Sequence, residues 1–579
     1  MSADPLAHLA DPAGLGVALD RAFARFGGRV AAIEGDRDRE NARLTYSDLG
    51  GRVARLAGFL AARGFKPGDR AAIVMSNQWK WHAYAAAIFR LGGTLVPLDF
   101  KLSGPEQVAL LAHCKAKVLA SEWHLLRAMG QDPAYAELPL QTVIATDVPD
   151  GQDIATPAAA ESFAFDDAEG METPPAVPRG DDDVACIVYS SGTGGRPKGC
   201  LLTHGNYLSQ FRALAELHPM DENTRYLSIL PTNHAIDFMV GFLGPYFCGA
   251  TVVHLRTLRP EFVKAAFPKY KITHMALVPM VLGNLENGLR QRIDELPPLR
   301  KAAFHVLRRT NGLLSGGKPN PKIARKLLGP IHQGFGGRLE ALFVGGAYTN
   351  PSTLRFFHDL GIPVANGYGL TEAGTAVTLD RLNPPHPDSV GVPLPGVEID
   401  IADPDPEGVG EIRVKSDTIM AGYLDDPQLT AESFDEGWLC TGDLGRLVDG
   451  SLQIMGRRKN MIVTAGGKNV YPEDVEVAYA GLPAKEICIF AAHYLWPEES
   501  RDERLVLVLR RDPDRTESDE ELVAQVAERN RRVADYKRVA GVILWDEDFP
   551  RTASMKIKRP LLGEQLTAQS SPDAILPAS

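Results

Sequence analysis

The stretch YSSGTGGRPKG, Tyr189 to Gly199, directly follows the apolar run Val184–Val188. An apolar run of this length that ends at a glycine-rich segment predicts a buried strand followed by a loop. Glycines allow many backbone N–H groups to point outward, and Lys198 adds a mobile positive charge, so the loop suits a polyphosphate. It is not a Walker loop, because Pro197 stands where that pattern requires its second glycine. Taken alone, the segment could also be a plain surface turn.

Length and composition limit the class of protein. A chain of 579 residues is too long for one hydrophobic core, so two or more domains are expected. The apolar content of 44% and charged content of 23% are typical of a globular protein. The net charge of −11 argues against a partner nucleic acid, which requires a basic face.

Cysteine usage and the N-terminus bear on location. The six cysteines are scattered without CxxC or metal spacing, which predicts reduced thiols and a cytoplasmic protein. The first residues lack the charged start and apolar core of a signal peptide. No apolar run reaches about 18 residues, so no membrane span is expected. Peripheral membrane contact and the oligomeric state stay open.

The order of patterns predicts the fold class. Residues 15–145 alternate helical and strand patterns, which indicates an α/β domain around a mostly parallel sheet. Residues 147–183 form an acidic, proline-rich surface connection, and residues 283–338 form a basic, helix-prone elaboration. We expect a large N-terminal domain of two α/β subdomains with a small β-subdomain, residues 1–456. A small, mobile α+β domain at 457–570 and a disordered tail at 571–579 follow.

Further along the chain, five more segments can be compared with known families. They are LFVGGAY from Leu342, NGYGLTEAG from Asn366, GWLCTGDLG from Gly437, GRRKNMIVTAGGKNVYPEDVE from Gly456 and PRTASMKIKR from Pro550. With the opening loop they make six ordered blocks over residues 45–559. In this combination the chain resembles the adenylate-forming (AMP-binding) superfamily of acyl-CoA synthetases, amino-acid adenylation domains and luciferases. Two positions depart from the family pattern: Gly194 replaces a hydroxyl residue and Met555 replaces a glycine.

The resemblance implies an acid-thiol ligase that uses ATP, Mg²⁺ and CoA. A carboxylate and ATP give an acyl-adenylate and pyrophosphate, and a thiol then displaces AMP. The nucleotide and thiol positions that it implies, in addition to Thr371, are Ser190, Ser191, Gly192, Thr193, Gly194, Gly195, Lys198, Gly345, Gly346, Ala347, Asn366, Gly367, Tyr368, Gly369, Asp443, Arg457, Lys459, Gly466 and Gly467. Tyr368 could instead be a core aromatic, and Gly466 and Gly467 could simply form a turn.

Three residues are candidates for the chemistry of adenylation. Glu372 offers the carboxylate that Mg²⁺ prefers beside substrate phosphates, and Thr371 can donate its hydroxyl to a phosphate oxygen. The resemblance makes Lys556 the cation that stabilises charge developing at the α-phosphate. Lys558 is the rival, because residues two apart share a face of an extended segment. Lys459 matches the family's hinge, about which the small domain rotates between the two half-reactions.

The substrate is less sharply indicated. The insertion at 283–338 and the segment LPTNHAID, Leu230 to Asp237, resemble long-chain fatty acyl-CoA synthetases, so a fatty acid is expected. His234 is then a candidate at the acyl tunnel or the nucleotide site, with a structural histidine as the alternative. Asp237 raises amino-acid activation as a rival, because adenylation domains place an aspartate here for the substrate ammonium. A fatty acyl-AMP ligase that loads a carrier protein and a catalytically inactive sensor remain as further alternatives.

Overall fold

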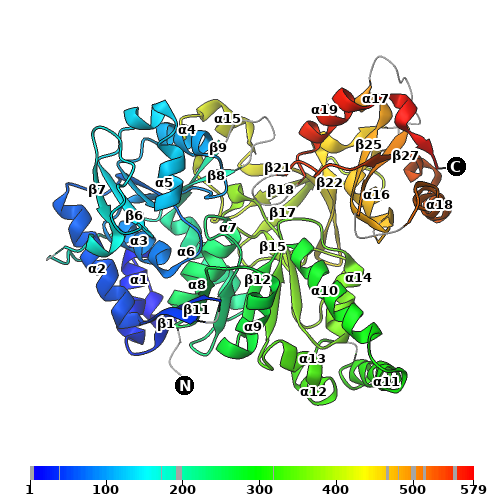
Figure 1. Ribbon diagram of the computed structural model, residues 1–579, viewed down its shortest axis with the longest axis horizontal. Helices are drawn as coiled ribbons and strands as arrows, with labels where there is room; N and C mark the ends of the chain where they lie inside the picture. The colour runs from blue at the N-terminus through cyan, green and yellow to red at the C-terminus, as the bar shows by residue number, and fades with distance from the viewer. Residues whose placement is uncertain are drawn as a thin grey trace. The chain divides into compact units, whose positions relative to one another are not determined.

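The computed structural model describes residues 6–37, 39–170, 172–190, 198–316, 318–463, 469–479, 481–496, 504–512, 517–551 and 557–578. The chain divides into two compact units (Figure 1). The first contains Met1–Ile399 and Val414–Leu439, and the second contains Asp400–Arg413 and Cys440–Ser579. None of the helices in the described part is long and apolar enough to cross a membrane.

The first unit is built on two mostly parallel sheets. One sheet has the order β16 (Val392–Pro393), β15 (Thr378–Leu379), β14 (Val364–Tyr368), β13 (Ala341–Val344), β12 (His274–Leu277), β10 (Arg225–Ser228), β11 (Thr251–Leu255), β1 (Val30–Asp36) and β2 (Arg39–Thr45). The other has the order β19 (Gly422–Tyr423), β9 (Lys198–Thr203), β8 (Val184–Ser190), β4 (Thr94–Pro97), β3 (Arg70–Val74), β5 (Val118–Glu122), β6 (Thr142–Thr146) and β7 (Glu161–Ala164). The predicted α/β class is confirmed.

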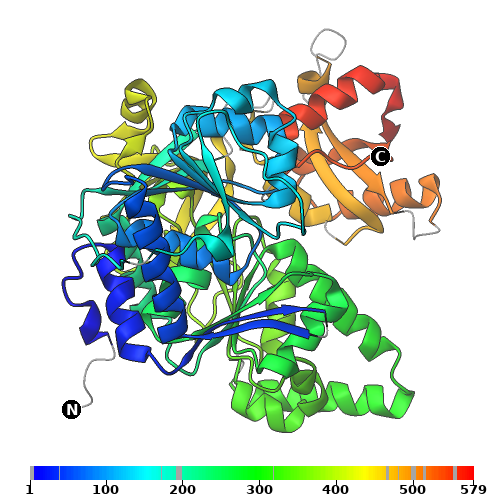
Figure 2. The ribbon, with the colours of Figure 1, turned by 60° about the vertical axis from the view of Figure 1, so that its left-hand side comes forward.

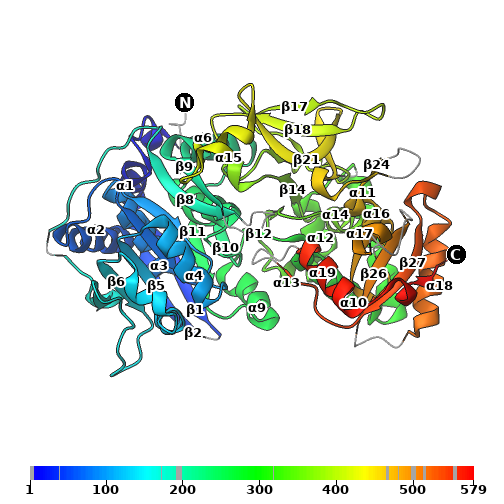
Figure 3. The same cartoon turned by 90° about the horizontal axis from the view of Figure 1, so that it is seen from above.

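Buried apolar runs and capped helices explain these elements. Strands β3, β4 and β5 carry almost wholly buried side chains, as expected for parallel strands covered on both faces. Helix α2 (Tyr46–Ala62) begins at a capping box in which Thr45 and Asp48 each satisfy a backbone N–H of the other. It packs with α1 (Leu15–Phe26) and α3 (Trp79–Arg90), and α2 lies against β1 and β2 whereas α3 lies against β3 and β4 (Figures 1 and 3). Helix α4 (Gly104–Cys114) packs on the eight-stranded sheet.

The elaboration expected at residues 283–338 is a group of four helices. These helices are α10 (Pro279–Asp294), α11 (Pro298–Leu314), α12 (Pro321–Leu327) and α13 (Gly329–Gly334). The group joins β12 to β13 and lies beside the nine-stranded sheet, with α11 at its outer edge (Figures 1 and 2). Leu282 of α10 and Phe304 of α11 belong to the hydrophobic core that covers this sheet.

The second unit contains a four-stranded sheet and its own helices. Its sheet has the order β25 (Ala484–Ala491), β26 (Leu505–Arg511), β27 (Val539–Trp545) and β28 (Leu576–Pro577), and its helices include α16 (Pro472–Tyr479), α18 (Asp519–Asn530) and α19 (Arg559–Gln569). The antiparallel strands β21 (Trp438–Val448) and β22 (Ser451–Arg457) precede them. The hairpin formed by these two strands lies mostly in the second unit, because this unit includes the chain from Cys440 onward. The unit therefore begins before the expected boundary at residue 457.

The C-terminus differs from the disordered tail expected at 571–579. Strand β28 pairs with β27, with Leu576 opposite Val542. Asn530, at the end of α18, is buried and donates from Nδ2 to the carbonyl oxygens of Val539, 2.9 Å away, and Ala578, 2.7 Å away. The backbone at the end of the chain is therefore hydrogen-bonded into the sheet, which a polar, Ser- and Pro-rich sequence did not reveal.

Candidate functional site

The opening loop of the sequence joins two antiparallel strands. Ser190 at the end of β8 lies opposite Lys198 at the start of β9. The buried residues of β8 fix one side of this hairpin in the eight-stranded sheet. Of the predicted loop positions, Ser190 and Lys198 are described. Ser191, Gly192, Thr193, Gly194 and Gly195 lie outside the described residues.

Glu372 connects this hairpin to the nine-stranded sheet. It lies in the short helix η5 (Thr371–Ala373), which begins three residues after β14. Its Oε1 accepts hydrogen bonds from Ser190 Oγ, 3.2 Å away, and from Tyr423 Oη, 3.0 Å away. The Glu372 side chain is half-buried, and within the described ranges it makes no ion pair. Among the described residues, this carboxylate is thus held in place by neutral donors only.

Tyr423 is a member of this cluster that the sequence did not single out. It lies on β19, opposite Cys200 of β9. Burial, and then the neighbouring Glu372 carboxylate, raises the pKa of the Tyr423 phenol, which therefore stays protonated and donates. The Lys198 Nζ lies 5.5 Å from the centre of its ring, in the range of a cation–π contact. No local motif marks Tyr423, because only the pairing of β19 with β9 brings it here.

The glycines after β13 leave space beside the backbone. Gly345 is buried, Gly346 is half-buried and Ala347 is exposed. A methyl group at Gly345 would lie 3.2 Å from the carbonyl oxygen of Gly367. Gly346 has a φ of +86°, a backbone conformation that residues with a side chain rarely adopt. The Cδ1 methyl group of Ile236 lies within 4 Å of the Cβ position at both glycines. The segment thus passes from the core to the surface beside an apolar side chain.

Residues of the NGYGLTE segment differ in exposure. Asn366 is buried, accepts from Thr349 Oγ1 at 3.0 Å and donates to the Ser389 carbonyl oxygen at 3.0 Å. Its side-chain amide therefore holds neighbouring loops, and its predicted contact with the nucleotide stays a prediction. Tyr368 is buried with an exposed fraction of 8%, as in the core alternative. At Gly369 a Cβ would lie 1.8 Å from the Thr375 carbonyl oxygen, so only glycine fits.

His234 lies in the loop that follows β10 of the nine-stranded sheet. It precedes α7 (Ala235–Asp237), is half-buried, and its Nε2 is 3.6 Å from Oδ2 of Asp99, which follows β4. No sequence motif connects Asp99 with His234. The pair places an imidazole and a carboxylate near Ile236, the apolar side chain that faces Gly345 and Gly346.

Asp237 does not fit the role of an ammonium ligand. Its side chain is fully buried and accepts from three hydroxyls, those of Tyr226 at 2.8 Å and of Ser228 and Thr232 at 2.9 Å. Burial raises its pKa to about 6. Because all three partners are hydroxyl donors from the core, Asp237 does not face a substrate ammonium. The alternative of amino-acid activation therefore lacks the residue on which it was based.

The TGD and GRRKN segments lie in the second unit. Asp443 of β21 is opposite Arg457 of β22, and Arg457 Nε is 2.8 Å from Asp443 Oδ1. Burial, and then the neighbouring Arg457, lowers the pKa of Lys459. The structure therefore brings the predicted ribose ligand and the predicted phosphate ligand together, with the expected hinge lysine two residues beyond.

The remaining predicted positions of this unit are Gly466, Gly467 and Lys556, which lie outside the described residues. The rival Lys558 is exposed and immediately precedes α19, where its N–H donates to the Pro550 carbonyl oxygen at 2.7 Å. The choice between Lys556 and Lys558 stays a prediction.

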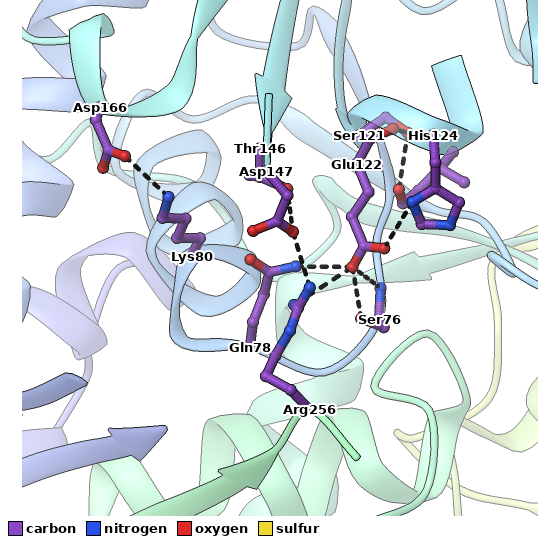
Figure 4. Close-up of polar contacts among 11 residues, drawn as sticks. Ser76, Gln78, Lys80, Ser121, Glu122, His124, Thr146, Asp147, Asp166 and Arg256 are labelled. Atoms are coloured by element: carbon purple, nitrogen blue, oxygen red, sulfur yellow. Dashed lines mark hydrogen bonds and ion pairs between the residues drawn. The ribbon is translucent and has the colours of Figure 1, made fainter. Parts of the chain in front are cut away.

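A second polar cluster surrounds Glu122, at the carboxyl end of β5 (Figure 4). Glu122 Oε1 accepts from the backbone N–H of Ser76 at 3.1 Å and from Gln78 Nε2 at 2.9 Å, and Arg256 Nη1 lies 3.4 Å away. Arg256 also pairs with Asp147 through Nη2 at 2.8 Å. Burial lowers the pKa of Arg256, but Glu122 and Asp147 more than offset this, and its pKa is raised. This cluster links β11 of one sheet to β5 and β6 of the other.

The donor set around Glu372 fits a divalent cation shared with a nucleotide. Within the described ranges no three His, Cys, Asp or Glu side chains gather as a metal cage. Mg²⁺ does not need one, since it is commonly bound by one or two carboxylates, substrate phosphates and water. Glu372, with neutral donors on a single oxygen and a half-exposed side chain, provides such a carboxylate.

Comparison with known proteins identifies the family. The model of the family described as "AMP-binding enzyme" matches residues 19–424. A feruloyl-CoA synthase from Amycolatopsis sp is 32% identical over 525 residues, 89% of this chain and 92% of that protein. A long-chain-fatty-acid–CoA ligase from Mycobacterium bovis is 30% identical over 452 residues, 75% of this chain and 72% of that protein.

A solved structure agrees with this result at the level of the fold. The O-succinylbenzoate CoA synthetase of Bacillus subtilis, in complex with ATP and a magnesium ion, superposes with a TM-score of 0.72 at 24% identity, covering 94% of this chain and 98% of that one. Adenylate-forming CoA ligases use ATP, Mg²⁺ and CoA, so the predicted set of cofactors and co-substrates is confirmed. The chain belongs to the AMP-binding enzyme family and is an acyl-CoA ligase that acts through an adenylate.

Proposed function

We propose that this protein activates a long-chain fatty acid as its acyl-adenylate and transfers the acyl group to CoA. The observation that carries the assignment of the adenylation site is the position of Glu372. Its carboxylate accepts hydrogen bonds from the hydroxyls of Ser190, at the end of β8, and of Tyr423. Its charge has no cationic partner among the described residues.

In the first step a carboxylate oxygen of the substrate attacks the α-phosphorus of ATP. The new O–P bond forms as the bond to the β-phosphate oxygen breaks, and pyrophosphate leaves. Glu372 would hold Mg²⁺, which when bound neutralises phosphate charge. Lys198 and Ser190, at the base of the loop, would bind the leaving phosphates, and Thr371 would donate to a phosphate oxygen. Lys556 would stabilise the charge that develops between the two anions.

In the second step the CoA sulfur attacks the acyl carbonyl carbon. The C–S bond forms, the bond to the AMP oxygen breaks and the thiol loses its proton. Asp443 and Arg457 would hold the ribose and the phosphate through both steps. The paired arrangement of these two residues supports this, because Arg457 orients the carboxylate at 2.8 Å. Lys459 as hinge, and Gly466 and Gly467 along the thiol path, remain proposals from the sequence.

The acyl site is proposed between Ile236, His234 and the Gly345–Gly346 segment. An apolar side chain next to two glycines leaves a lipophilic surface without side-chain obstruction. The helix group α10–α13 and the similarity to a long-chain-fatty-acid ligase support a fatty acid. The second candidate is an aromatic acid, which is favoured by the higher identity to a feruloyl-CoA synthase over a larger share of the chain.

Pyrophosphate release with ATP, Mg²⁺ and a panel of acids tests this proposal. The panel is a saturated fatty acid series from short to long chains, together with ferulate. We expect the highest kcat/KM with a long-chain acid, and a maximum with ferulate would instead select the aromatic substrate. CoA is then added, and thioester formation separates a CoA ligase from a ligase that loads a carrier protein. Absence of pyrophosphate with every acid would favour a sensor.

A further inference from the structure

Helix α11 attaches to the first unit by one face. Phe304 and Asn311, seven residues apart, are the two buried residues of this helix. Asn311 Nδ2 donates to the carbonyl oxygen of Asp359 at 3.1 Å, and Phe304 joins the core beside the nine-stranded sheet. Since residues seven apart lie on nearly the same side of a helix, these two define its inner face.

The outer face of α11 is apolar, which reverses the usual pattern. Leu299, Val306 and Leu313 also follow a seven-residue spacing and are 87%, 64% and 77% exposed. Leu314 and Leu307 extend the same face, with exposed fractions of 64% and 36%. A surface helix normally turns such a stripe toward the core. A single exposed aliphatic side chain needs no explanation, but four leucines and a valine on one helix form a patch that marks an interaction site.

Positive charge borders this apolar face. Helix α11 contains Arg300, Lys301, Arg308 and Arg309 and no acidic residue. At 100° per residue, Arg309 lies along one border of the stripe and Arg300 along the other. The absence of acid continues beyond the helix, because residues 296–339 contain no Asp or Glu although the whole chain has a net charge of −11. This segment therefore concentrates positive charge in an acidic protein.

We propose that the outer face of α11 docks on an anionic membrane surface. The exposed aliphatic side chains would enter the boundary between headgroups and acyl chains, while the bordering arginines meet anionic headgroups. At 17 residues with polar borders, the helix would lie on the membrane. Charge complementarity selects this occupant over a second copy of the chain, because two facing α11 helices would bring together the bordering arginines, Arg300 and Arg309, of both copies without an acid from either helix. The inference does not depend on the acyl specificity proposed above.

Binding of the full chain to lipid vesicles tests the proposal. The probe is sedimentation with vesicles of phosphatidylcholine alone or of phosphatidylcholine mixed with phosphatidylserine, at low and high salt. We expect binding to the mixed vesicles that weakens as salt rises. The triple variant Leu299→Ser, Val306→Ser, Leu313→Ser should bind at least roughly a hundredfold more weakly, since each buried aliphatic side chain contributes strongly to transfer from water.

A charge variant and a matched control complete the test. Replacement of Arg300 and Arg309 by Gln should weaken binding to the mixed vesicles by roughly thirtyfold and remove most of the salt dependence. The control variant Leu258→Ser, Leu561→Ser removes exposed leucines elsewhere and should bind as the original protein does. Circular dichroism and pyrophosphate release with a water-soluble acid should be unchanged in all variants, which separates this proposal from the proposed function.

Two outcomes would overturn the docking proposal. One is vesicle binding in which the triple serine variant, or a neutral vesicle, performs as well as the original protein with anionic vesicles. The other is an original protein that sediments as a dimer in ultracentrifugation while the serine variant is a monomer, which would assign the face to a second copy of the chain.

Discussion

Glu372 and Glu122 are two carboxylates placed near strand ends in the same unit, yet their surroundings differ. Glu122 is nearly inaccessible and is surrounded by fixed donors that include the Arg256 guanidinium (Figure 4). Glu372 is half-buried and receives two neutral hydroxyls on one oxygen. A carboxylate whose charge is already compensated joins two sheets, whereas one that retains its charge and some exposure can bind a cation together with a substrate.

The largest expected effect comes from breaking the compensated cluster. Replacement Arg256→Met leaves Glu122 and Asp147 without their shared cation, and the free energy of unfolding should fall by about 3–5 kcal/mol. Urea denaturation measures this change. The double variant Glu122→Gln, Arg256→Met should recover part of the loss, and kcat/KM for adenylation in the folded protein should stay near the original value. Loss of adenylation without loss of stability would place this cluster in the site.

The second prediction concerns the uncompensated carboxylate. Glu372→Gln keeps the shape and the hydroxyl contacts but removes the charge. We expect kcat/KM for pyrophosphate release to fall by roughly 10²–10³-fold, comparable to the loss of one transition-state donor, and the free energy of unfolding to change by less than about 0.5 kcal/mol. Glu122→Gln is the matched control. It should lower the free energy of unfolding but leave kcat/KM for pyrophosphate release near the original value. Activity within a fewfold of the original would contradict the metal role.

Asp237 sharpens the comparison because it is buried like Glu122 but has hydroxyl partners like Glu372. Burial raises its pKa to about 6, above about 3.9 in an unfolded chain. The folded protein therefore binds the proton more tightly. The stability from the protonated form is present below about pH 4, is lost as the pH rises to about 6 and stays lost above that.

The size of this effect is about 3 kcal/mol at most, from the roughly two-unit difference in pKa. Denaturant midpoints measured between about pH 4 and pH 6 test it. In Asp237→Asn this part of the pH dependence should disappear, while Glu372→Gln should retain it. An unchanged slope in Asp237→Asn would mean that another group carries the titration.

The smallest effect is expected for the donors to Glu372. Tyr423→Phe removes one hydrogen bond to the carboxylate but leaves the ring beneath Lys198, so the cost should be about 0.5–1.5 kcal/mol. We expect this loss to raise the Mg²⁺ concentration that is needed for half-maximal pyrophosphate release by twofold to tenfold. Ser190→Ala should give an effect of similar size. If Tyr423→Phe altered KM for the acid alone, the phenol would belong to the acyl site.

Local sequence patterns predicted much of the fold and part of the candidate site. The alternation of apolar runs and helical segments predicted the parallel sheets, because strand burial and helix periodicity depend on residues that are close in the sequence. The segments NGYGLTE and LFVGGAY predicted residues that the structure places at the carboxyl ends of β14 and β13. Their glycines are required where backbone approaches backbone, as at Gly369. The motif did not predict the hydrogen bonds that join the Asn366 amide to neighbouring loops, and its contact with the nucleotide stays a prediction.

The sequence by itself determined the α/β class, the absence of a membrane-spanning pattern and the positions of the ordered blocks. The tertiary structure decided which distant side chains meet: Ser190 and Tyr423 at Glu372, Arg256 at Glu122, and the hydroxyls that enclose Asp237. It also decided that the apolar face of α11 points outward. The physical reason is that periodicity and turn chemistry act between near neighbours, whereas strand order and register are fixed by burial of the whole core.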